Sequence, residues 1–345
     1  MIDFRNDYGQ GAHEQVLDAL TALAGRSFSG YGEDELCLAA QQRVRRLTSQ
    51  PQAALHFLSG GTQANLTVIA SMLRPHQGVI AADTAHIAAH ETGAIEATGH
   101  KVLTLPHRDG KLCPDDVERL VAQHYADESF EHTVQPGMVY ISNTTELGSI
   151  YTAQELAALS RVCRARNLPL YLDGARLGYA LASQGNDLTL ADVAKHCDAF
   201  TIGLTKQGAL FGEAVVIVNP ALQRDFRYII KQRGGMLAKG WLMGAQFEAL
   251  MEDDLYGQLS RHAVGLAMRL KEGLKEMAVP FLSDSPSNQQ FPILPNDVIA
   301  ALREQFAFHL IEVVDEEHTG VRFCTSWYTR PEDVEALLAA LARLI

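Results

Sequence analysis

The chain has 345 residues, of which 47% are hydrophobic and 20% are charged, so it can form one large or two ordinary folding units with real cores. This composition excludes a disordered chain and a miniprotein. With 41 acidic and 29 basic residues, the formal net charge is −12. We therefore expect neither nucleic acid nor an anionic membrane surface to be a partner.

The cysteines and the amino terminus both bear on the cellular compartment. Five cysteines are widely spaced and form no C-x-x-C pair, so neither a disulfide framework nor a zinc knuckle is indicated. Charged residues occur within the first seven positions, where a secretory signal would need an apolar stretch. The longest stretch without Asp, Glu, Lys or Arg, 47–73, contains polar and small residues at 59–65, which argues against a membrane span. We expect a cytoplasmic protein.

Short apolar runs alternate with longer segments of helical period through the first two thirds of the chain. The predicted strands are 54–58, 79–82, 101–105, 138–142, 168–172, 199–202 and 214–218, and the predicted helices between them are 64–73, 113–123, 153–166 and 190–196. This alternation predicts an α/β fold with a largely parallel, helix-covered sheet. In such a sheet, the ligand crevice lies beyond the carboxyl ends of the strands.

The pattern changes after residue 220. Long helical periods cover 221–232, 237–251 and 256–277, followed by predicted strands at 279–282, 291–294, 308–314 and 320–324, and helices at 297–305 and 331–345. We therefore expect a large domain over residues 1–250, including an amino-terminal arm, and a smaller α+β domain over residues 251–345.

The segment Phe57–Asn65 reads as an apolar strand, a Ser59-Gly60-Gly61-Thr62 turn and the start of a helix. Backbone N–H groups at a helix start attract anions, and glycines let an anion approach closely, so a phosphate would fit this turn. The alternative is an ordinary strand-to-helix turn capped by Ser59 or Thr62. A Walker loop is excluded because no G-K-[ST] follows.

Two further strands end in ionisable residues. Asp173 follows the apolar run 168–172, and burying its carboxylate is costly unless a cation faces it; the alternative is a helix cap. Lys206 follows 199–202 and is the only basic residue between Lys195 and Arg224. A surface lysine is the ordinary interpretation, but the apolar and small neighbours favour a partly desolvated amine whose pKa can fall.

An anion-binding turn, an acid and a lone lysine at the strand ends of one sheet are the set that a pyridoxal phosphate enzyme needs. The turn would hold the cofactor phosphate, Lys206 would form the Schiff base, and Asp173 would keep a proton on the ring nitrogen. Each signal is weak alone. Their order and spacing make the combination more specific.

The sequence resembles the low-specificity threonine aldolases and the wider β-eliminating lyase group. The resemblance covers nearly the whole chain and is carried by the motifs Phe4-Arg5-Asn6-Asp7, Tyr31-Gly32-Glu33-Asp34, Gly60-Gly61-Thr62, Asp83-Thr84-Ala85-His86, Leu172-Asp173-Gly174-Ala175-Arg176, Thr205-Lys206 and Val321-Arg322-Phe323. It implies the aspartate aminotransferase-like fold of the pyridoxal phosphate enzymes. It also implies a homodimer or homotetramer, with the stretch through Asp34 contributing to a neighbour's pocket.

The resemblance also implies roles for individual residues. The catalytic set would be Lys206, Asp173 and His86, and the cofactor would be held by Lys206, Asp173, Gly60, Gly61, Thr62, His86 and Arg176. His86 resembles the imidazole that stacks on the cofactor ring. Arg176 and Arg322 resemble arginines that bind the substrate carboxylate or neighbouring cofactor oxygens, and Asn6 is expected among the substrate ligands.

Several positions depart from the family pattern. Asn6 stands where many relatives have Ser, and Asn143-Thr144-Thr145-Glu146 replaces Asn-Thr-His-Asn. Leu210-Phe211-Gly212-Glu213 replaces a segment with Pro and Gly after the lysine, and Leu237 replaces an arginine, for which Lys239 is a candidate substitute. These changes weaken the substrate assignment more than the cofactor assignment.

Two other patterns are weaker. His86 and His90 have the i, i+4 spacing of a metal pair, but no third ligand is indicated nearby, so no metal is expected. Gly9-Gln10-Gly11 lacks a third glycine and a preceding strand, which argues against nicotinamide binding.

The leading hypothesis is a pyridoxal phosphate-dependent aldolase that cleaves a β-hydroxy-α-amino acid of the threonine or allo-threonine type to glycine and an aldehyde. The alternatives in the same family are a β-eliminating lyase and an aldolase for phenylserine-like substrates. A cofactor-free binding protein on the same scaffold is the alternative outside the enzymes. The sequence leaves open the exact amino acid, its stereochemistry and the choice between dimer and tetramer.

Overall fold

The apolar runs of the first two thirds of the chain form one seven-stranded sheet in the computed structural model, which describes residues 1–345. In spatial order the strands are β2 (Ala54–Leu58), β8 (Glu213–Ile217), β7 (Ala199–Gly203), β6 (Leu170–Asp173), β5 (Gln135–Ser142), β3 (Gln77–Ala82) and β4 (Val102–Leu105). From β7 to β4 all neighbours pair in parallel, whereas β8 is antiparallel to both β2 and β7. The predicted α/β fold with a largely parallel sheet is confirmed.

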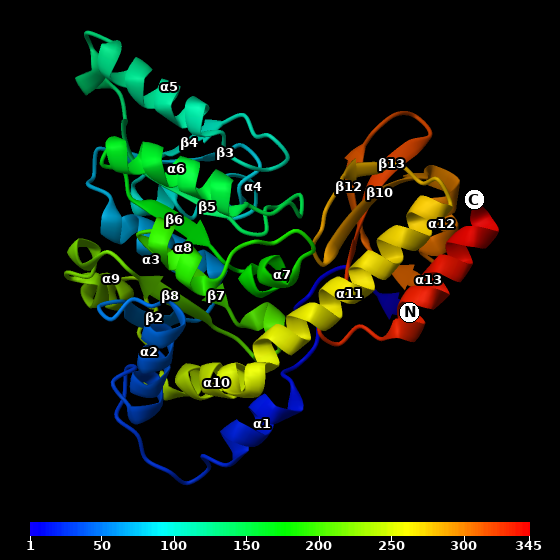
Figure 1. Cartoon of the computed structure of the whole chain (residues 1–345), viewed down its shortest axis with the longest axis horizontal. Helices are drawn as coiled ribbons and strands as arrows, with labels where there is room; N and C mark the ends of the chain where they lie inside the picture. The colour runs from blue at the N-terminus through cyan, green and yellow to red at the C-terminus, as the bar shows by residue number, and fades with distance from the viewer.

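Helices cover this sheet on both faces (Figure 1). They are α1 (Glu14–Thr21), α2 (Glu35–Leu47), α3 (Gly61–Met72), α4 (His86–Ala89), α5 (Pro114–Ala126), α6 (Ala153–Ala165), α7 (Leu177–Ala182), α8 (Leu190–His196), α9 (Phe226–Gln232) and α10 (Trp241–Met251). Helices α6 and α8 both begin with a capping box, in which a threonine and an acidic residue satisfy each other's backbone N–H groups. Because both faces are covered, the five inner strands are buried nearly throughout, whereas the edge strands β2 and β4 are partly exposed.

The structure corrects the predicted helix over 221–232. This helix begins only at Phe226, because Asp225 before it has a left-handed backbone with φ of 60°. Helices α1, α2 and α7 were not predicted. Both α1 and α2 contact α10, so their apolar faces are buried by a segment far away in the sequence.

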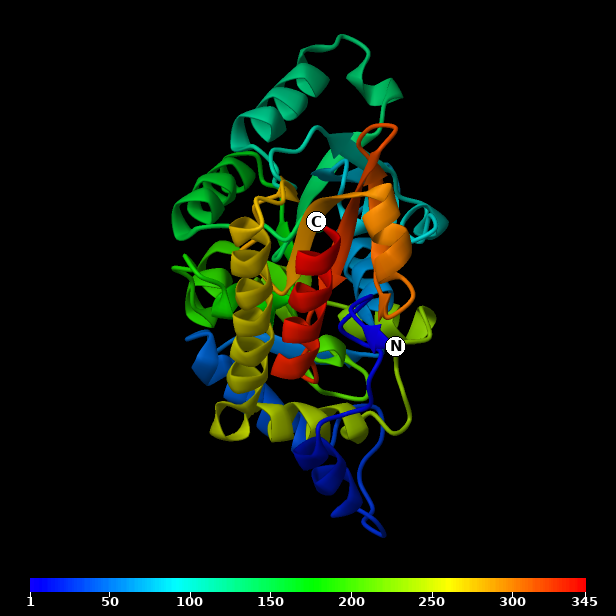
Figure 2. The same ribbon diagram turned by 90° about the vertical axis from the view of Figure 1, so that its right-hand side faces the viewer.

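The smaller unit contains an antiparallel sheet in the order β12 (His309–Val313), β13 (His318–Cys324), β10 (Gln289–Pro295) and β9 (Phe281–Ser283). It also contains α12 (Asn296–Leu302), α13 (Pro331–Leu344) and a short parallel ladder of β1 (Ile2–Asp3) with β11 (Phe306–Ala307). The amino terminus and the carboxyl terminus therefore lie on the same side of the molecule (Figures 1 and 2). An α+β unit at the carboxyl end is confirmed.

The 22-residue helix α11 (Leu255–Glu276) runs between the two units (Figure 1). Its first turns contribute Leu255 and Leu259 to the 55-residue core of the large unit, and its later turns contribute Leu270 and Leu274 to the 17-residue core of the small unit. The division at residue 250 stays a prediction. None of the helices, α11 included, combines the length and apolarity needed to cross a membrane.

The different surroundings of two glycines predict opposite effects of alanine substitutions on fold stability. A methyl group at Gly174 would overlap the carbonyl oxygen of Thr201, so Gly174→Ala should lower the free energy of unfolding by about 1 to 3 kcal/mol. Gly265 lies in an exposed position of α11 with no atom near its missing Cβ, so Gly265→Ala should raise it by about 0.5 to 1 kcal/mol. Urea denaturation of both variants measures the two effects. Equal effects of the two variants would contradict this packing.

Candidate active site

Three strands of the large sheet deliver the predicted polar groups to one cavity. The strands β2, β6 and β7 end beside the turn at residues 59–61, at Asp173 and at the 3₁₀ turn η3 (Thr205–Gln207), respectively. A cavity of about 290 Å³ opens at this carboxyl edge. Its lining includes seven of the nine predicted site residues, namely Gly60, Gly61, Thr62, His86, Asp173, Arg176 and Lys206. The other two, Asn6 and Arg322, lie outside its lining.

The turn before α3 is open to an anion. Gly60 is the residue that precedes α3, and no side chain caps the helix start there. Methyl groups added at Gly60 or Gly61 would meet no atom within 4 Å, so the backbone is accessible from the cavity. Ser59 does not cap the helix, because its N–H and hydroxyl both donate to Gln63 Oε1 at 3.1 and 2.8 Å. The N–H groups of the first turn are therefore available to a phosphate.

The Asp173 carboxylate is held by donors from three directions. Its Oδ2 accepts hydrogen bonds from Asn65 Nδ2 at 2.8 Å and from the Tyr140 hydroxyl at 2.7 Å, while Oδ1 accepts from the Ala175 N–H at 2.9 Å. The residue is only 6% exposed. It does not cap α7, which is preceded by Arg176. Donors that are themselves neutral stabilise an ionised carboxylate without cancelling its charge.

A second buried carboxylate, Glu91, supports His86. Glu91 Oε1 accepts from Asn65 Nδ2 at 2.7 Å and lies 2.7 Å from His86 Nδ1, and the glutamate side chain has no exposed surface. Burial lowers the pKa of His86, but the hydrogen bond to Glu91 and the charge of Asp173 outweigh it, so the pKa lies above the ordinary value. Because Nδ1 is engaged, Nε2 is the nitrogen free to meet a ligand.

Lys206 presents an unpaired amine to the cavity. Its backbone is fixed by the Tyr179 hydroxyl, which donates to the Lys206 carbonyl oxygen at 2.5 Å, but its Nζ forms neither a hydrogen bond nor an ion pair. Burial and the charge of Arg176 lower the pKa of the amine below its ordinary value. A lysine of this kind is a better nucleophile at neutral pH than a surface lysine.

Arg176 lines the cavity but is already bound. Its Nε and Nη2 donate to the two carboxylate oxygens of Asp7 at 2.7 and 3.0 Å, and Asn288 Nδ2 donates to the same carboxylate at 3.0 Å. Asp7 is completely buried. The planar donor fork of Arg176 is therefore directed to Asp7, and its positive charge remains next to Lys206.

Arg322 and Asn6 lie near the amino-terminal arm. Arg322 Nη2 donates to the Arg5 carbonyl oxygen at 3.0 Å, while Arg322 Nε is buried without a partner. Burial, His86 and Arg322 together lower the pKa of His90, which places the Arg322 charge close to this histidine pair. Asn6 Oδ1 accepts the N–H of Tyr8 at 3.1 Å and so stabilises its own turn. The substrate roles of both residues stay predictions.

Two more carboxyl groups line the cavity at positions where the sequence departs from the family pattern. Glu146 Oε1 accepts from the Ser142 hydroxyl at 2.7 Å and from the His86 N–H at 2.9 Å. Burial, assisted by the charge of Asp173, raises the pKa of Glu146. Glu213 lies at the start of β8 and is also buried. Neither residue was assigned a role from the sequence. For Glu213, the available signal was an acid in an otherwise apolar segment after the lysine.

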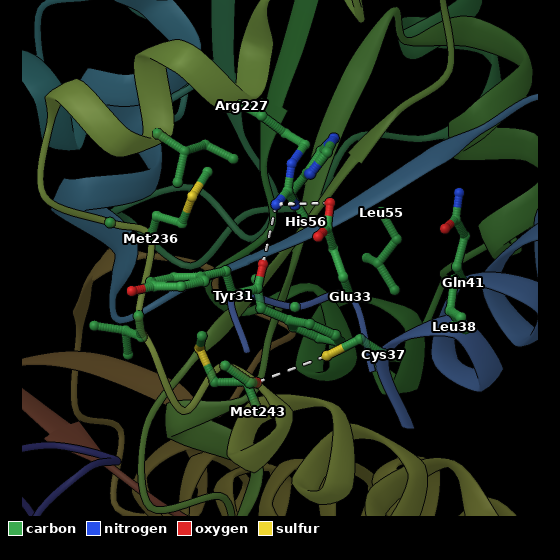
Figure 3. A pocket seen from close by; sticks show the side chains of 16 residues that line it. Tyr31, Glu33, Cys37, Leu38, Gln41, Leu55, His56, Arg227, Met236 and Met243 are labelled. Carbon is green, nitrogen blue, oxygen red and sulfur yellow. Dashed lines mark hydrogen bonds and ion pairs between the residues drawn. The ribbon is translucent and has the colours of Figure 1, made fainter. Parts of the chain in front are cut away.

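Another cavity, of about 440 Å³, lies between β2 and α10 (Figure 3). Arg227 reaches Glu33 at 3.2 Å and the Tyr31 carbonyl oxygen at 3.3 Å across it. Burial lowers the pKa of His56 to about 4, and burial raises the pKa of the Cys37 thiol. This cavity therefore contains a neutral imidazole and a protonated thiol, and no activated nucleophile. The smaller cavity is the candidate active site.

The sequence matches the family model described as beta-eliminating lyase over residues 3–295. The chain belongs to the beta-eliminating lyase family. A low specificity L-threonine aldolase from a Pseudomonas strain is 31% identical over 97% of this chain and 96% of its own. The solved threonine aldolase of Leishmania major is 46% identical, with a TM-score of 0.97 over 100% of this chain and 99% of that one.

The comparisons also confirm the predicted fold class. A Thermus thermophilus aspartate aminotransferase double mutant superposes with a TM-score of 0.73 at 15% identity, covering 100% of this chain and 92% of its own. At this identity the likeness concerns the fold alone. The large parallel sheet and the small antiparallel unit are thus those of the aspartate aminotransferase-like proteins.

The pairing of Glu91 with His86 gives a testable prediction. Replacing Glu91 by Gln removes the negative charge beside His86 Nδ1, so the pKa of His86 should fall. Histidine NMR titration of the protein measures this pKa. Glu96→Gln is the matched control, since Glu96 is exposed on the same segment and makes no contact with His86. An unchanged His86 pKa in Glu91→Gln would rule out the pairing.

Proposed function

We propose that this chain is a pyridoxal phosphate-dependent aldolase that cleaves a β-hydroxy-α-amino acid of the threonine type into glycine and an aldehyde. The observation that carries the proposal is one cavity that holds an unpaired lysine amine, a buried aspartate with neutral hydrogen-bond donors and an uncapped helix start. The threonine aldolases of Pseudomonas and Leishmania major support the choice of reaction.

The residues of the cavity fit pyridoxal phosphate. Gly60, Gly61 and Thr62 would hold the phosphate on the free N–H groups of α3, and Lys206 would bind the cofactor covalently. Asp173 would pair with the ring nitrogen and keep it protonated. When bound, the cofactor supplies a ring that accepts the electrons left on Cα after a bond to that carbon breaks.

Arg322 is the proposed ligand of the substrate carboxylate. Its buried Nε has no partner within the chain, so one donor of the guanidinium is unused. Arg176 is less suited to this task because Asp7 already occupies its donor fork. We assign Arg176 to the cofactor side instead, where burial and the charge of Arg176 together lower the pKa of the Lys206 amine. Asn6 remains a substrate ligand only as the family resemblance implies.

His86 is the proposed base for the substrate hydroxyl. In the cleavage, the bond from Cα to Cβ breaks, the hydroxyl proton moves to His86 Nε2 and Cα takes up a proton, which yields glycine and an aldehyde. Glu91 on the opposite nitrogen orients the ring and stabilises the imidazolium that forms, as the buried acid of a catalytic triad does. Since the pKa of His86 is raised, the reaction should accelerate as the pH rises through that pKa.

We further propose that the enzyme is cytoplasmic and works as a homodimer or homotetramer. Five unpaired cysteines suit a reducing compartment. Tyr31 and Tyr228 are 46% and 77% exposed on one face, and aromatic side chains of this kind are enriched at protein interfaces. In this assembly, Lys239 is a candidate to complete the active site of a neighbouring subunit.

Product analysis tests the reaction. With L-threonine or L-allo-threonine and added pyridoxal phosphate, the protein should release equal amounts of glycine and acetaldehyde. Lys206→Ala is the matched control and should reduce the rate by at least about a thousandfold, because it removes the covalent attachment point. Release of 2-oxobutanoate and ammonia, the products of β-elimination from threonine, would indicate the β-eliminating lyase instead. A protein that binds no cofactor would favour the cofactor-free binding protein.

A further inference from the structure

Glu213 is placed at the active site by the direction of its strand. Because β8 is antiparallel to its neighbours, its first residue lies at the edge where the other strands end. In the register, Glu213 pairs with Leu58 of β2 and with Gly203 of β7. The next residues along those strands lead to the phosphate-binding turn and to Lys206, respectively. Glu213 therefore lies between the phosphate-binding turn and the lysine, and it lines the cavity with both.

The carboxyl group of Glu213 is buried and has no partner. The residue is 2% exposed, its Oε2 is inaccessible, and neither oxygen forms a hydrogen bond or an ion pair. An ion pair with Lys206 is not formed, although both side chains line the same cavity. An ionised carboxylate without a partner is very costly at such a position, whereas a protonated acid is much less so.

Few other groups can compensate a negative charge on Glu213. The ionisable groups that act on it are Lys206 after β7, Asp173 at the end of β6, and the tyrosines Tyr171 and Tyr256. Burial raises the pKa of Glu213 to about 8; the charge of Lys206 opposes this shift, and the charge of Asp173 adds to it. At neutral pH the acid is therefore protonated, and it becomes ionised only above about pH 8.

We propose that Glu213 is a neutral hydrogen-bond donor to the cofactor site, and that its ionisation weakens the binding of a phosphate ester on the Gly60–Thr62 turn. This inference rests on the proposed function. A phosphate dianion in the same cavity as an ionised Glu213 would meet a like charge, whereas the protonated acid offers an O–H donor. Protonated Glu213 thus adds no negative charge to a cavity that also contains Asp173 and Glu146 and is proposed to hold a phosphate.

The test uses pyridoxine 5′-phosphate, which lacks the aldehyde and cannot bond to Lys206. Its dissociation constant for the cofactor-free protein is measured by calorimetry between about pH 7.5 and about pH 9.5, above the range in which the phosphate itself titrates. For the wild-type protein the affinity should fall about tenfold as Glu213 ionises. For Glu213→Gln, which keeps a donor and cannot ionise, the affinity should fall clearly less. Titration of Lys206 or His86 affects both proteins, so the difference between the two slopes reports Glu213.

Two further variants separate donation from charge. Glu213→Met has a similar volume but no donor, so at about pH 7.5 it should bind the analogue about three to ten times more weakly than Glu213→Gln does. Glu128→Gln is the matched surface control, because Glu128 is exposed and forms no ion pair. It should behave as the wild type throughout.

Folding stability, measured without cofactor, tests the proton on Glu213 even if the variants bind the analogue poorly. Glu213 holds a proton in the folded protein up to about pH 8, whereas in the unfolded chain an ordinary glutamate releases it near pH 4.5. Folding stability should therefore fall with rising pH across this window in the wild type, and less in Glu213→Gln and Glu213→Met. The melting temperature of each variant minus that of the wild type should increase from about pH 5 to about pH 8 and then level off.

The outcomes are distinct. If the analogue binds with the same pH slope in the wild type and in Glu213→Gln, or if the melting difference does not change with pH, the inference about Glu213 is wrong while the proposed function stands. If neither pyridoxal phosphate nor the analogue binds at all, the proposed function fails, and the melting experiment alone then decides whether Glu213 carries a proton.

Discussion

The site depends on the hydrogen bonds that hold the buried Asp173 carboxylate at the cavity. Burying a carboxylate without hydrogen-bond donors is costly, and a neutral acid could not hold a proton on a ring nitrogen. Asn65, Tyr140 and the Ala175 N–H solve this by donating three hydrogen bonds, each of a kind worth about 1.5 to 3 kcal/mol to a charged acceptor. None of these donors is charged, so the negative charge remains available to a ligand.

Hydrogen bonds, an ion pair and burial also control the charges of the other groups in the cavity. Asn65 donates to both Asp173 and Glu91, which connects the acid and His86 through one amide. Asp7 forms an ion pair with Arg176, and burial together with the charge of Arg176 lowers the pKa of Lys206. Burial raises the pKa of both Glu146 and Glu213, and Glu213, with a pKa of about 8, adds no negative charge at neutral pH. The cavity thus combines a hydrogen-bonded aspartate with an amine of lowered pKa, and an amine is nucleophilic in its neutral form.

The sequence predicted the framework of this arrangement well, because it depends on local patterns. Buried parallel strands have continuous apolar runs, and the residues that follow them, such as Asp173 and Lys206, meet at one edge of the sheet. The supporting residues were not predictable in the same way. Asp7 is 169 positions from Arg176 and Asn65 is 108 positions from Asp173, so only the folded chain shows that they touch. The direction of β8 also depends on tertiary pairing, and it alone makes the start of that strand part of the site.

The most direct test of the account is to reduce the pyridoxal phosphate-loaded protein with borohydride and to map the modified peptide by mass spectrometry. The account predicts that the cofactor is attached to Lys206, the unpaired amine that faces Asp173 in the cavity. Attachment at another lysine, or no attachment at all, would contradict it.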